Sequence, residues 1–478
     1  MLERLRHPLS AVVLAFLLTA PWVGTRLYVF FTPSLDSPEA LLSTGAVVAV
    51  SGLAVLGASF LLAWGAETAE KDVPRAFAIA VLAILAVAPE YAVDALYAWN
   101  AGANAGTAEG ARNANLAVAN MTGANRILIG IGWSAIALFT IYKARTTNDP
   151  AVEKRRGFLR DVVTLDRGIA TEIAFLLAAT AFAFLVPFSL GSFDGSGAVG
   201  GIGIVDTVVL VGLYLVYIAI IIRGDVEHEE QVGVPGYLQS WSKAPRIASV
   251  LFLFVYSGTM IFISVEHFAH GLEVLGTENN IPEFFMIQWV APLASEAPEL
   301  IVVAYLVNKA RSTAGFNALI SSKLNQWTLL IGTIAVVYSI AAGEIATLPF
   351  DEKQVAEIWI TAAQSFFAIA ILTNFEISLR EAVGLFVLFI SQVLIEFAII
   401  LSFPETGSGT FTALGLTLPN SAEALSIYVL YAYTVLYLVI GGYLFATRWD
   451  EVRMLFGRTV TNAREAFGGE TAQPDHAD

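Results

Sequence analysis

Two short motifs place a glutamate directly after a proline within apolar stretches of the 478-residue chain. One motif is Ala-Pro-Glu ending at Glu90, and the other is Ala-Pro-Glu ending at Glu299. A proline removes a backbone donor and frees the carbonyl four residues earlier, here on Leu85 and Ala294. A charged carboxylate inside a bilayer costs at least about 2.5 kcal/mol on insertion scales, so carboxylates kept there indicate a functional site.

A polar patch follows each motif on the next apolar stretch. It reads NMTGANRILIGIG over residues 120–132 and ISSKLNQWTLLIG over residues 320–332. Each patch has an asparagine, Asn125 or Asn325, seven residues before its last glycine. Carboxylates, freed carbonyls and side-chain amides together form an all-oxygen ligand set, which suits a hard cation such as Ca²⁺ or Na⁺.

Further charges lie close to these motifs in the sequence. Asp94 and Glu296 are one helical turn from Glu90 and Glu299, respectively. Arg126 and Lys323 lie in the two polar patches, and we expect them to pair with some of these four acids as built-in counter-cations. The candidate cation-binding residues from this pattern are Glu90, Asp94, Asn125, Glu296, Glu299 and Asn325.

Structural alternatives exist for each of these residues. Glu90 and Glu299 would also suit a buried ion pair with the two bases. Asp94 and Glu296 could instead satisfy a base or face a water-filled vestibule, and the asparagines could instead form hydrogen bonds between helices. Glu396 has Gln392 one turn earlier; we expect a local hydrogen bond between them, with an accessory proton site as the alternative.

The composition is that of an integral membrane protein. Hydrophobic residues make up 56% of the chain and charged residues only 14%, against about 25% charged residues in soluble proteins. With 26 basic and 41 acidic residues, the chain lacks the basic surface that nucleic acid requires as a partner. It has no Walker motif and no nucleophile–base set, so we expect neither a cofactor nor enzymatic activity.

Twelve stretches are apolar enough to cross a bilayer, which takes about 20 residues in a helix. They cover approximately residues 9–31, 40–66, 76–99, 115–142, 168–188, 203–222, 247–270, 284–308, 316–342, 355–373, 381–403 and 421–446. With the N-terminus inside, 21 of the 26 basic residues fall in inside loops, and only Arg112 and Lys353 fall in outside loops. The positive-inside rule therefore predicts an all-α multi-pass protein of the cell membrane with both termini cytoplasmic.

The two Pro-Glu motifs lie five spans apart, so their helices cross the membrane in opposite directions. Shared order, shared spacing and opposite direction indicate two inverted-topology repeats. In such proteins the substrate binds near the middle of the bilayer, where interrupted helices of the two repeats meet.

This pattern resembles the cation/Ca²⁺ exchanger superfamily, the sodium/calcium exchanger-like membrane proteins. The resemblance implies two inverted repeats of five helices, with one extra helix at each end of this chain. Glu90 and Glu299 then correspond to the two metal-binding glutamates of the family, and Gln326 corresponds to the ligand position on the partner helix. The implied organisation is 1–39 (extra helix), 40–222 (first repeat), 223–246 (cytoplasmic loop), 247–403 (second repeat) and 404–478 (extra helix and cytoplasmic tail).

The chain departs from the family pattern at several positions. Sodium-coupled members have Thr-Ser before Pro-Glu, whereas residues 86–88 here are Ala-Val-Ala; Ser295 retains a hydroxyl in the second repeat. Gln326 is similar to the residue that the proton-coupled branch carries. Arg126, its counterpart in the first repeat, matches neither branch.

These observations predict a secondary active antiporter that exchanges Ca²⁺, or a related cation, for Na⁺ or H⁺ by alternating access. Its partners would be the lipid bilayer and small inorganic cations, with Ca²⁺ as the transported substrate. Two alternatives stay open: an exchanger fold with an altered substrate, and a non-transporting scaffold or sensor. The sequence also leaves open the coupling ion and whether the chain forms a homo-oligomer.

Overall fold

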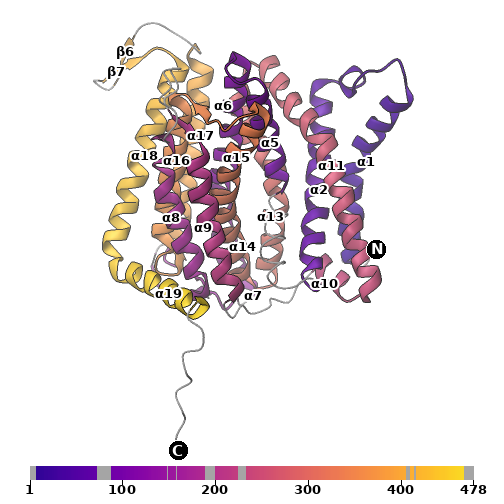
Figure 1. The fold of residues 1–478 in the computed structure, drawn as a ribbon. Helices are drawn as coiled ribbons and strands as arrows, with labels where there is room; N and C mark the ends of the chain where they lie inside the picture. The colour runs from indigo at the N-terminus through magenta and orange to yellow at the C-terminus, as the bar shows by residue number, and fades with distance from the viewer. Residues whose placement is uncertain are drawn as a thin grey trace, which may run out of the picture.

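The computed structural model describes residues 7–72, 88–147, 149–157, 159–188, 200–223, 233–404, 410–413 and 416–467. Helices make up most of these residues, and most of the long ones run alongside one another as a bundle (Figure 1). The start of α1 (Pro8–Phe31) and helix α19 (Trp449–Phe467) lie toward the same end of this bundle. We call this end, which is at the bottom of Figure 1, the lower end.

The remaining elements follow in chain order. The helices are α2 (Thr44–Ala69), α5 (Ala88–Ala103), α6 (Ala108–Ile127), α7 (Ser134–Thr147), α8 (Ala170–Ala183), α9 (Ile204–Arg223), α10 (Gly233–Gln239), α11 (Lys243–Glu278), α12 (Glu283–Trp289), α13 (Ala291–Asn308), α14 (Ser312–Asn325), α15 (Ile331–Ala342), α16 (Glu352–Leu372), α17 (Leu379–Ser402) and α18 (Ala422–Thr447). Short antiparallel strands pair as β1 (Val152–Glu153), β2 (Val162–Thr164) and β5 (Glu376–Ser378), as β3 (Gly200–Ile202) and β4 (Leu348–Phe350), and as β6 (Thr410–Ala413) and β7 (Leu416–Pro419).

The helices agree with the predicted spans wherever the structure describes them. Ten helical stretches of the described residues are long and apolar enough to cross a membrane, and the bent stretch 283–308 raises this number to 11. The remaining predicted span, 76–99, lies partly outside the described residues, and α5 covers only its second part. The chain is thus a multi-pass, all-α membrane protein, while the count of twelve stays a prediction.

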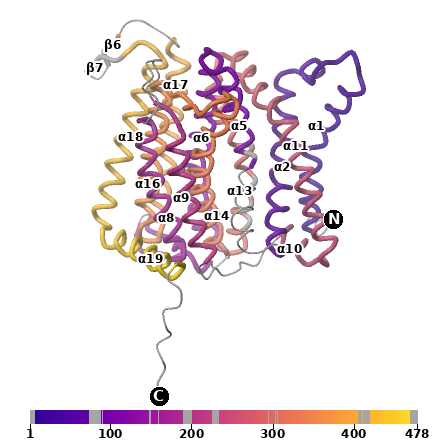
Figure 2. Tube along the Cα trace, viewed as in Figure 1, coloured from indigo at the N-terminus to yellow at the C-terminus, as the bar shows by residue number. Residues whose placement is uncertain are grey.

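The first helices of the two halves, α2 and α11, lie side by side and antiparallel (Figure 2). At one end the Thr44 hydroxyl donates to Glu278 Oε1 at 2.9 Å. At the other end Arg246 donates two hydrogen bonds of 2.6 Å to Asp72, just beyond α2. These bonds hold the pKa of the Asp72 carboxyl below its usual value. Equivalent helices that run in opposite directions are what an inverted repeat requires.

The two halves also exchange packing partners. Helix α5 packs against α15 of the other half, and α13 correspondingly packs against α7. The same relation holds for α9 with α15 and for α17 with α7. Each half therefore completes its packing on the other, and the predicted inverted repeat is confirmed in the described residues.

Irregular backbone occurs at corresponding places in the two halves. A π-helical segment, Leu128–Trp133, joins α6 to α7, and another, Gln326–Leu330, joins α14 to α15. Such segments occur frequently at functional sites. In the second half the stretches Glu283–Ala297 and Glu299–Asn308 meet at 51°, with Pro298 between them. In the first half the described part of α5 starts at Ala88, and Leu85 lies outside the described residues.

Helix α19 is an element that the sequence analysis did not predict, since it placed only a cytoplasmic tail after the last span. Val452 and Leu455 are buried on one side of α19, while Trp449 and Phe467 are exposed. The helix packs against α8 and α9 at the lower end. It is amphipathic and has too many charges for a search based on continuous apolar stretches.

One glycine of α6 allows a close contact with α12. A Cβ atom added at Gly123 of α6 would lie 1.8 Å from the backbone oxygen of Gln288 in α12. We expect Gly123→Ala to destabilise the protein by about 1–3 kcal/mol, as overpacking does. Gly384→Ala is the matched control, because nothing lies within 4 Å of a Cβ at that position of α17. Thermal unfolding in detergent should show a loss only for Gly123→Ala; equal melting temperatures would contradict the prediction.

Candidate cation site

Helices α5 and α13 bring the two Pro-Glu carboxylates together inside the bundle. Glu90 is only 3% exposed, and Glu299 is partly buried. The Glu90 carboxylate accepts a hydrogen bond from Ser295 and interacts electrostatically with Glu299 and Asp94. Residues from both halves therefore meet at one place, as the sequence predicts.

Each of the other three acids has a hydrogen-bond donor on the helix that follows its own. Asn120 of α6 donates to Asp94 Oδ1 at 2.8 Å. Gln326 donates to Glu296 Oε1 at 2.5 Å, and the Ser322 hydroxyl donates to Glu299 Oε2 at 2.9 Å. Glu296 also interacts electrostatically with Glu90 and Glu299. The four predicted acids thus form a single buried group.

Several oxygen atoms of this group have no hydrogen-bond partner. They are Glu90 Oε2, Asp94 Oδ2, Asn120 Oδ1, Glu296 Oε2 and Gln326 Oε1, and all are buried. Buried polar atoms are normally paired, and each unpaired one requires an explanation such as an ion. Five buried oxygens without a donor provide the ligand type that a hard cation takes.

The oxygens that the structure describes in the acidic group lie in one region of the protein, but they do not surround a common point at which a metal ion could bind. Among the described residues, no three His, Cys, Asp or Glu side chains come close enough together to hold a metal ion. Carboxylates without a cation between them repel one another, which favours separation. The identity of the cation ligands among these residues stays a prediction.

Lys323 is the base that lies within this group. Its Nζ donates to Asn125 Oδ1 at 2.6 Å and lies 4.4 Å from the centre of the Trp327 ring. It also interacts electrostatically with Glu296. The amide oxygen of Asn125, a predicted cation ligand, is therefore engaged by an ammonium group. Asn325 is buried at the end of α14, next to Gln326.

Arg126 has a different partner from the four acids with which we expected it to pair. Its guanidinium forms an ion pair of 2.6 Å with Glu357 of α16, and it also donates to Gln392 of α17. The side chains of Arg126 and Glu357 are 1% and 0% exposed. Arg126 follows Asn125 directly, and consecutive helical residues point about 100° apart, so the two face different neighbours. The four acids accordingly face one base, Lys323, rather than two.

The Arg126 ion pair belongs to a second buried polar network that the sequence analysis missed. Gln392 donates to Glu396 Oε2 at 2.8 Å, which confirms the local hydrogen bond expected for this pair. Lys353 Nζ lies 3.9 Å from Glu396 Oε1. Glu357 could have indicated this network in the sequence, because it is an acid within the tenth predicted span, 355–373.

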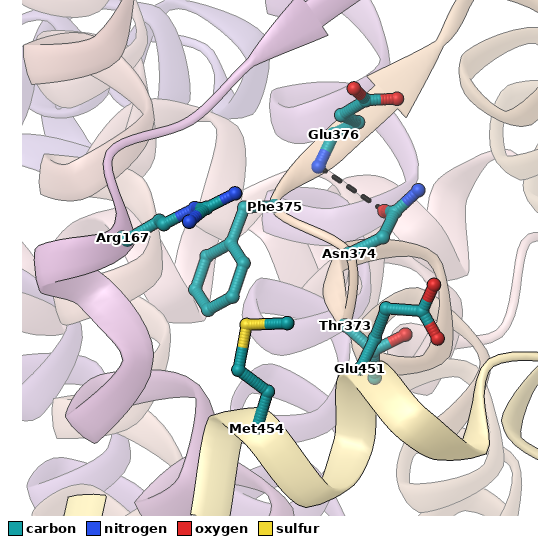
Figure 3. A pocket seen from close by; sticks show the side chains of 7 residues that line it. All are labelled: Arg167, Thr373, Asn374, Phe375, Glu376, Glu451 and Met454. Carbon is teal, nitrogen blue, oxygen red and sulfur yellow. Dashed lines mark hydrogen bonds between the residues drawn. The ribbon is translucent and has the colours of Figure 1, made fainter. Parts of the chain in front are cut away.

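A cavity of about 340 Å³ lies away from both networks, at the lower end of the bundle. Figure 3 shows Arg167 before α8, residues 373–376 after α16, and Glu451 and Met454 of α19 around it. Among these residues the Glu376 backbone N–H donates to Asn374 Oδ1 at 3.2 Å. None of the predicted site residues lines this cavity.

Removing the ammonium group from the acidic group should strengthen cation binding. Two unit charges 4 Å apart interact by about 4 kcal/mol at a dielectric of about 20, so Lys323→Gln is expected to lower the apparent Kd for Ca²⁺ by about tenfold or more. Lys323→Arg keeps the charge and serves as the control. The dependence of initial ⁴⁵Ca²⁺ uptake rates on Ca²⁺ concentration measures the effect. An unchanged or higher apparent Kd for Lys323→Gln would show that the lysine does not oppose the cation.

Comparisons with known proteins agree with this geometry. A family model described as sodium/calcium exchanger protein matches residues 43–223 and 249–439. The crystal structure of the H⁺/Ca²⁺ exchanger CAX shares 39% sequence identity and a TM-score of 0.76, over 96% of this chain and 98% of that one. The Ca²⁺/H⁺ antiporter protein YfkE has the same fold at 13% identity, with a TM-score of 0.55 over 80% of this chain and 99% of that one. No curated protein sequence matches significantly.

The family match covers both halves of the chain and includes the residues of the acidic group. Members of this family are membrane exchangers and not enzymes. The chain therefore belongs to the sodium/calcium exchanger protein family.

Proposed function

We propose that the protein is a secondary active antiporter that exchanges Ca²⁺ for H⁺ by alternating access. The observation that carries this proposal is the meeting of Glu90 with Glu296 and Glu299 from the opposite half of the chain. The 39% identical relative named as an H⁺/Ca²⁺ exchanger supports the choice of both ions.

The buried carboxylates provide a physical reason for antiport. A carboxylate at this depth needs a proton or a cation, because an uncompensated buried charge is costly. Four acids face one ammonium group, so the group has unmet negative charge when the acids are ionised. Ca²⁺ and protons then compete for the same oxygens, and a state that holds one releases the other. The inverted repeats supply the two equivalent halves that alternating access uses.

Proton coupling suits these residues better than sodium coupling. Residues 86–88 of the first half are Ala-Val-Ala and supply no hydroxyl for Na⁺. Asn125 Oδ1 accepts a hydrogen bond from Lys323, so one amide oxygen of the polar patches is already engaged. One oxygen ligand fewer therefore remains for a second bound metal ion.

Transport assays in proteoliposomes test the proposal. We expect ⁴⁵Ca²⁺ uptake when a pH gradient is imposed and none when a Na⁺ gradient is imposed at equal pH. A pH-sensitive dye inside the vesicles should report proton movement opposite to Ca²⁺. Uptake with the Na⁺ gradient alone would overturn the coupling ion, and no uptake with either gradient would overturn Ca²⁺ antiport.

We further propose that the protein lies in the cell membrane with both termini and the lower end cytoplasmic. The distribution of basic residues supports this orientation. The chain has no cysteine, so single introduced thiols can be labelled without removing native ones. Ser240→Cys, beside α10, should react only with a permeant thiol reagent in intact cells, and Ala105→Cys, beyond α5, should react with an impermeant one. The reverse labelling pattern would invert the topology.

A further inference from the structure

Glu172 and Glu357 occupy the same position in the two halves. Each is the sixth residue of its helical stretch, which starts at Arg167 in one half and at Glu352 in the other, and each precedes an isoleucine. Because the halves are inverted, the two glutamates lie toward opposite ends of the bundle. Glu172 is on the side of the lower end, next to the residue Thr171 that α19 contacts.

The two glutamates differ in their counter-charges. Glu357 is neutralised by Arg126 at 2.6 Å. The counterpart of Arg126 in the second half is Gln326, which has no charge and instead donates to Glu296. Among the described residues, no Lys, Arg or His forms an ion pair with Glu172. The inverted repeat therefore has a permanent ion pair at one position and a carboxyl group without a cation at the other.

The hydrogen bonds of Glu172 leave one of its oxygens free. The Tyr217 hydroxyl of α9 donates to Glu172 Oε1 at 3.3 Å, whereas Oε2 is buried without a partner. A carboxyl group in such a place is stable when neutral and is charged only at a cost. This environment suits a group that accepts a proton and later releases it.

Polar groups connect Glu172 to the acidic group. Tyr217 also forms a hydrogen bond with the Ser321 side chain of α14. The next residue, Ser322, donates its hydroxyl to Glu299 at 2.9 Å. Ser321 and Ser322 are consecutive residues of α14, and their side chains contact Tyr217 and Glu299, respectively.

The groups around Glu172 are otherwise neutral. On α9 the titratable neighbours are Tyr217 and, beside it, Tyr214, whose hydroxyl has no partner. From α19, Asn462 donates to the Thr171 hydroxyl at 3.0 Å, and Thr459 donates to the Ala170 backbone oxygen at 3.3 Å. Helix α16, which also packs on α8, contributes no ion pair to Glu172 in the described part of the chain. Its charge is therefore set by its proton alone.

We propose that Glu172 is a proton-binding site distinct from the cation site, and that it transfers protons between Glu299 and the lower end of the bundle. When Ca²⁺ displaces the proton of Glu299, the Ser322 oxygen accepts it, and we include in the proposal that Ser322 passes its own hydroxyl proton to the neighbouring Ser321. Ser321 in turn gives its hydroxyl proton to the Tyr217 oxygen. Tyr217 gives its own proton to the Glu172 carboxylate, so the tyrosine and the serines end neutral, as they began. Protonated Glu172 then releases the proton to water at the lower end. This inference rests on the proposed H⁺ coupling.

Two transport modes of the full-length protein in proteoliposomes test the inference. The first is ⁴⁵Ca²⁺ uptake driven by a pH gradient, and the second is ⁴⁵Ca²⁺/Ca²⁺ exchange at equal pH, which needs the cation site but no net proton transfer. We expect Glu172→Gln to slow the first mode by at least about tenfold, since positioned proton-transfer groups contribute about 10²–10⁴-fold. The second mode should stay within a factor of about two, as a folded protein with an intact cation site requires.

Tyrosine variants provide a matched pair. Tyr217→Phe removes the hydroxyl that binds Glu172 and should slow only the pH-driven mode, whereas Tyr214→Phe should slow neither. Glu172→Asp keeps a carboxyl group and should restore part of the pH-driven rate. If Glu172→Gln leaves both modes unchanged, or slows both equally, Glu172 is not a proton carrier. Failure of the unmodified protein in the pH-driven mode would instead overturn the proposed function.

Discussion

Replacing either Pro-Glu carboxylate, as Glu90→Gln or as Glu299→Gln, is expected to abolish Ca²⁺ transport while the protein still folds. Each half of the chain contributes its Pro-Glu carboxylate to the acidic group. Loss of a residue that only forms a hydrogen bond to a metal ligand already lowers metal affinity by about 10- to 100-fold. Loss of a carboxylate that binds the cation directly should therefore reduce ⁴⁵Ca²⁺ uptake by more than about 100-fold.

Stability provides the second readout for these variants. Glutamine has nearly the same shape as glutamate, and the change removes one of four acids that interact electrostatically in a buried place. Melting temperatures in detergent should therefore stay equal or rise, as is common where residues are kept for function. Glu109→Gln, at an exposed position of α6, is the control and should leave both transport and stability unchanged. If both Pro-Glu variants transported Ca²⁺ at the normal rate, the candidate site would be wrong.

The second large effect is expected at the buried ion pair of Arg126 and Glu357. Removing one partner leaves the other charge buried without compensation, which costs about 3–5 kcal/mol. Arg126→Gln and Glu357→Gln should each lower the free energy of unfolding by this amount. The double variant should be more stable than the sum of the single losses predicts, since neither charge is then left alone.

A double-mutant cycle of thermal or denaturant unfolding in detergent measures this coupling. Glu153→Gln serves as the comparison, because Glu153 pairs with Arg155 at 2.8 Å and the two side chains are 58% and 38% exposed. That variant should change the free energy of unfolding far less, as is usual for exposed pairs. Strict additivity of the Arg126 and Glu357 variants would mean that the two residues stabilise the protein independently.

The repeat and the acidic group could be predicted from the sequence because both depend on short, regular patterns. Pro-Glu motifs five spans apart determine opposite helix directions, and helical spacing brings Asp94 and Glu296 next to Glu90 and Glu299. The structure confirms these relations in the residues that it describes. Hydropathy identified the spans because lipid excludes unpaired polar backbone.

The partner of Arg126 could not be predicted in the same way. Whether it faces the acidic group or α16 depends on the rotation of α6 about its axis, which the packing of the whole bundle sets and the local sequence does not. Helix α19 was missed for another reason, since its apolar residues lie along one side and never form a continuous stretch. The strands are too short, at two to four residues, to show an alternating pattern.

The exchange of packing partners between the halves has a consequence for biosynthesis. Helix α5 needs α15, and α7 needs α13 and α17, yet these partners are synthesised more than 100 residues later. The first five spans therefore enter the bilayer before Ser295 and Glu299 of the second half, which lie next to Glu90 in the folded protein, have been synthesised. The membrane-inserted first half is consequently an unfinished intermediate, exposed to quality-control proteases until the ribosome has delivered the second half.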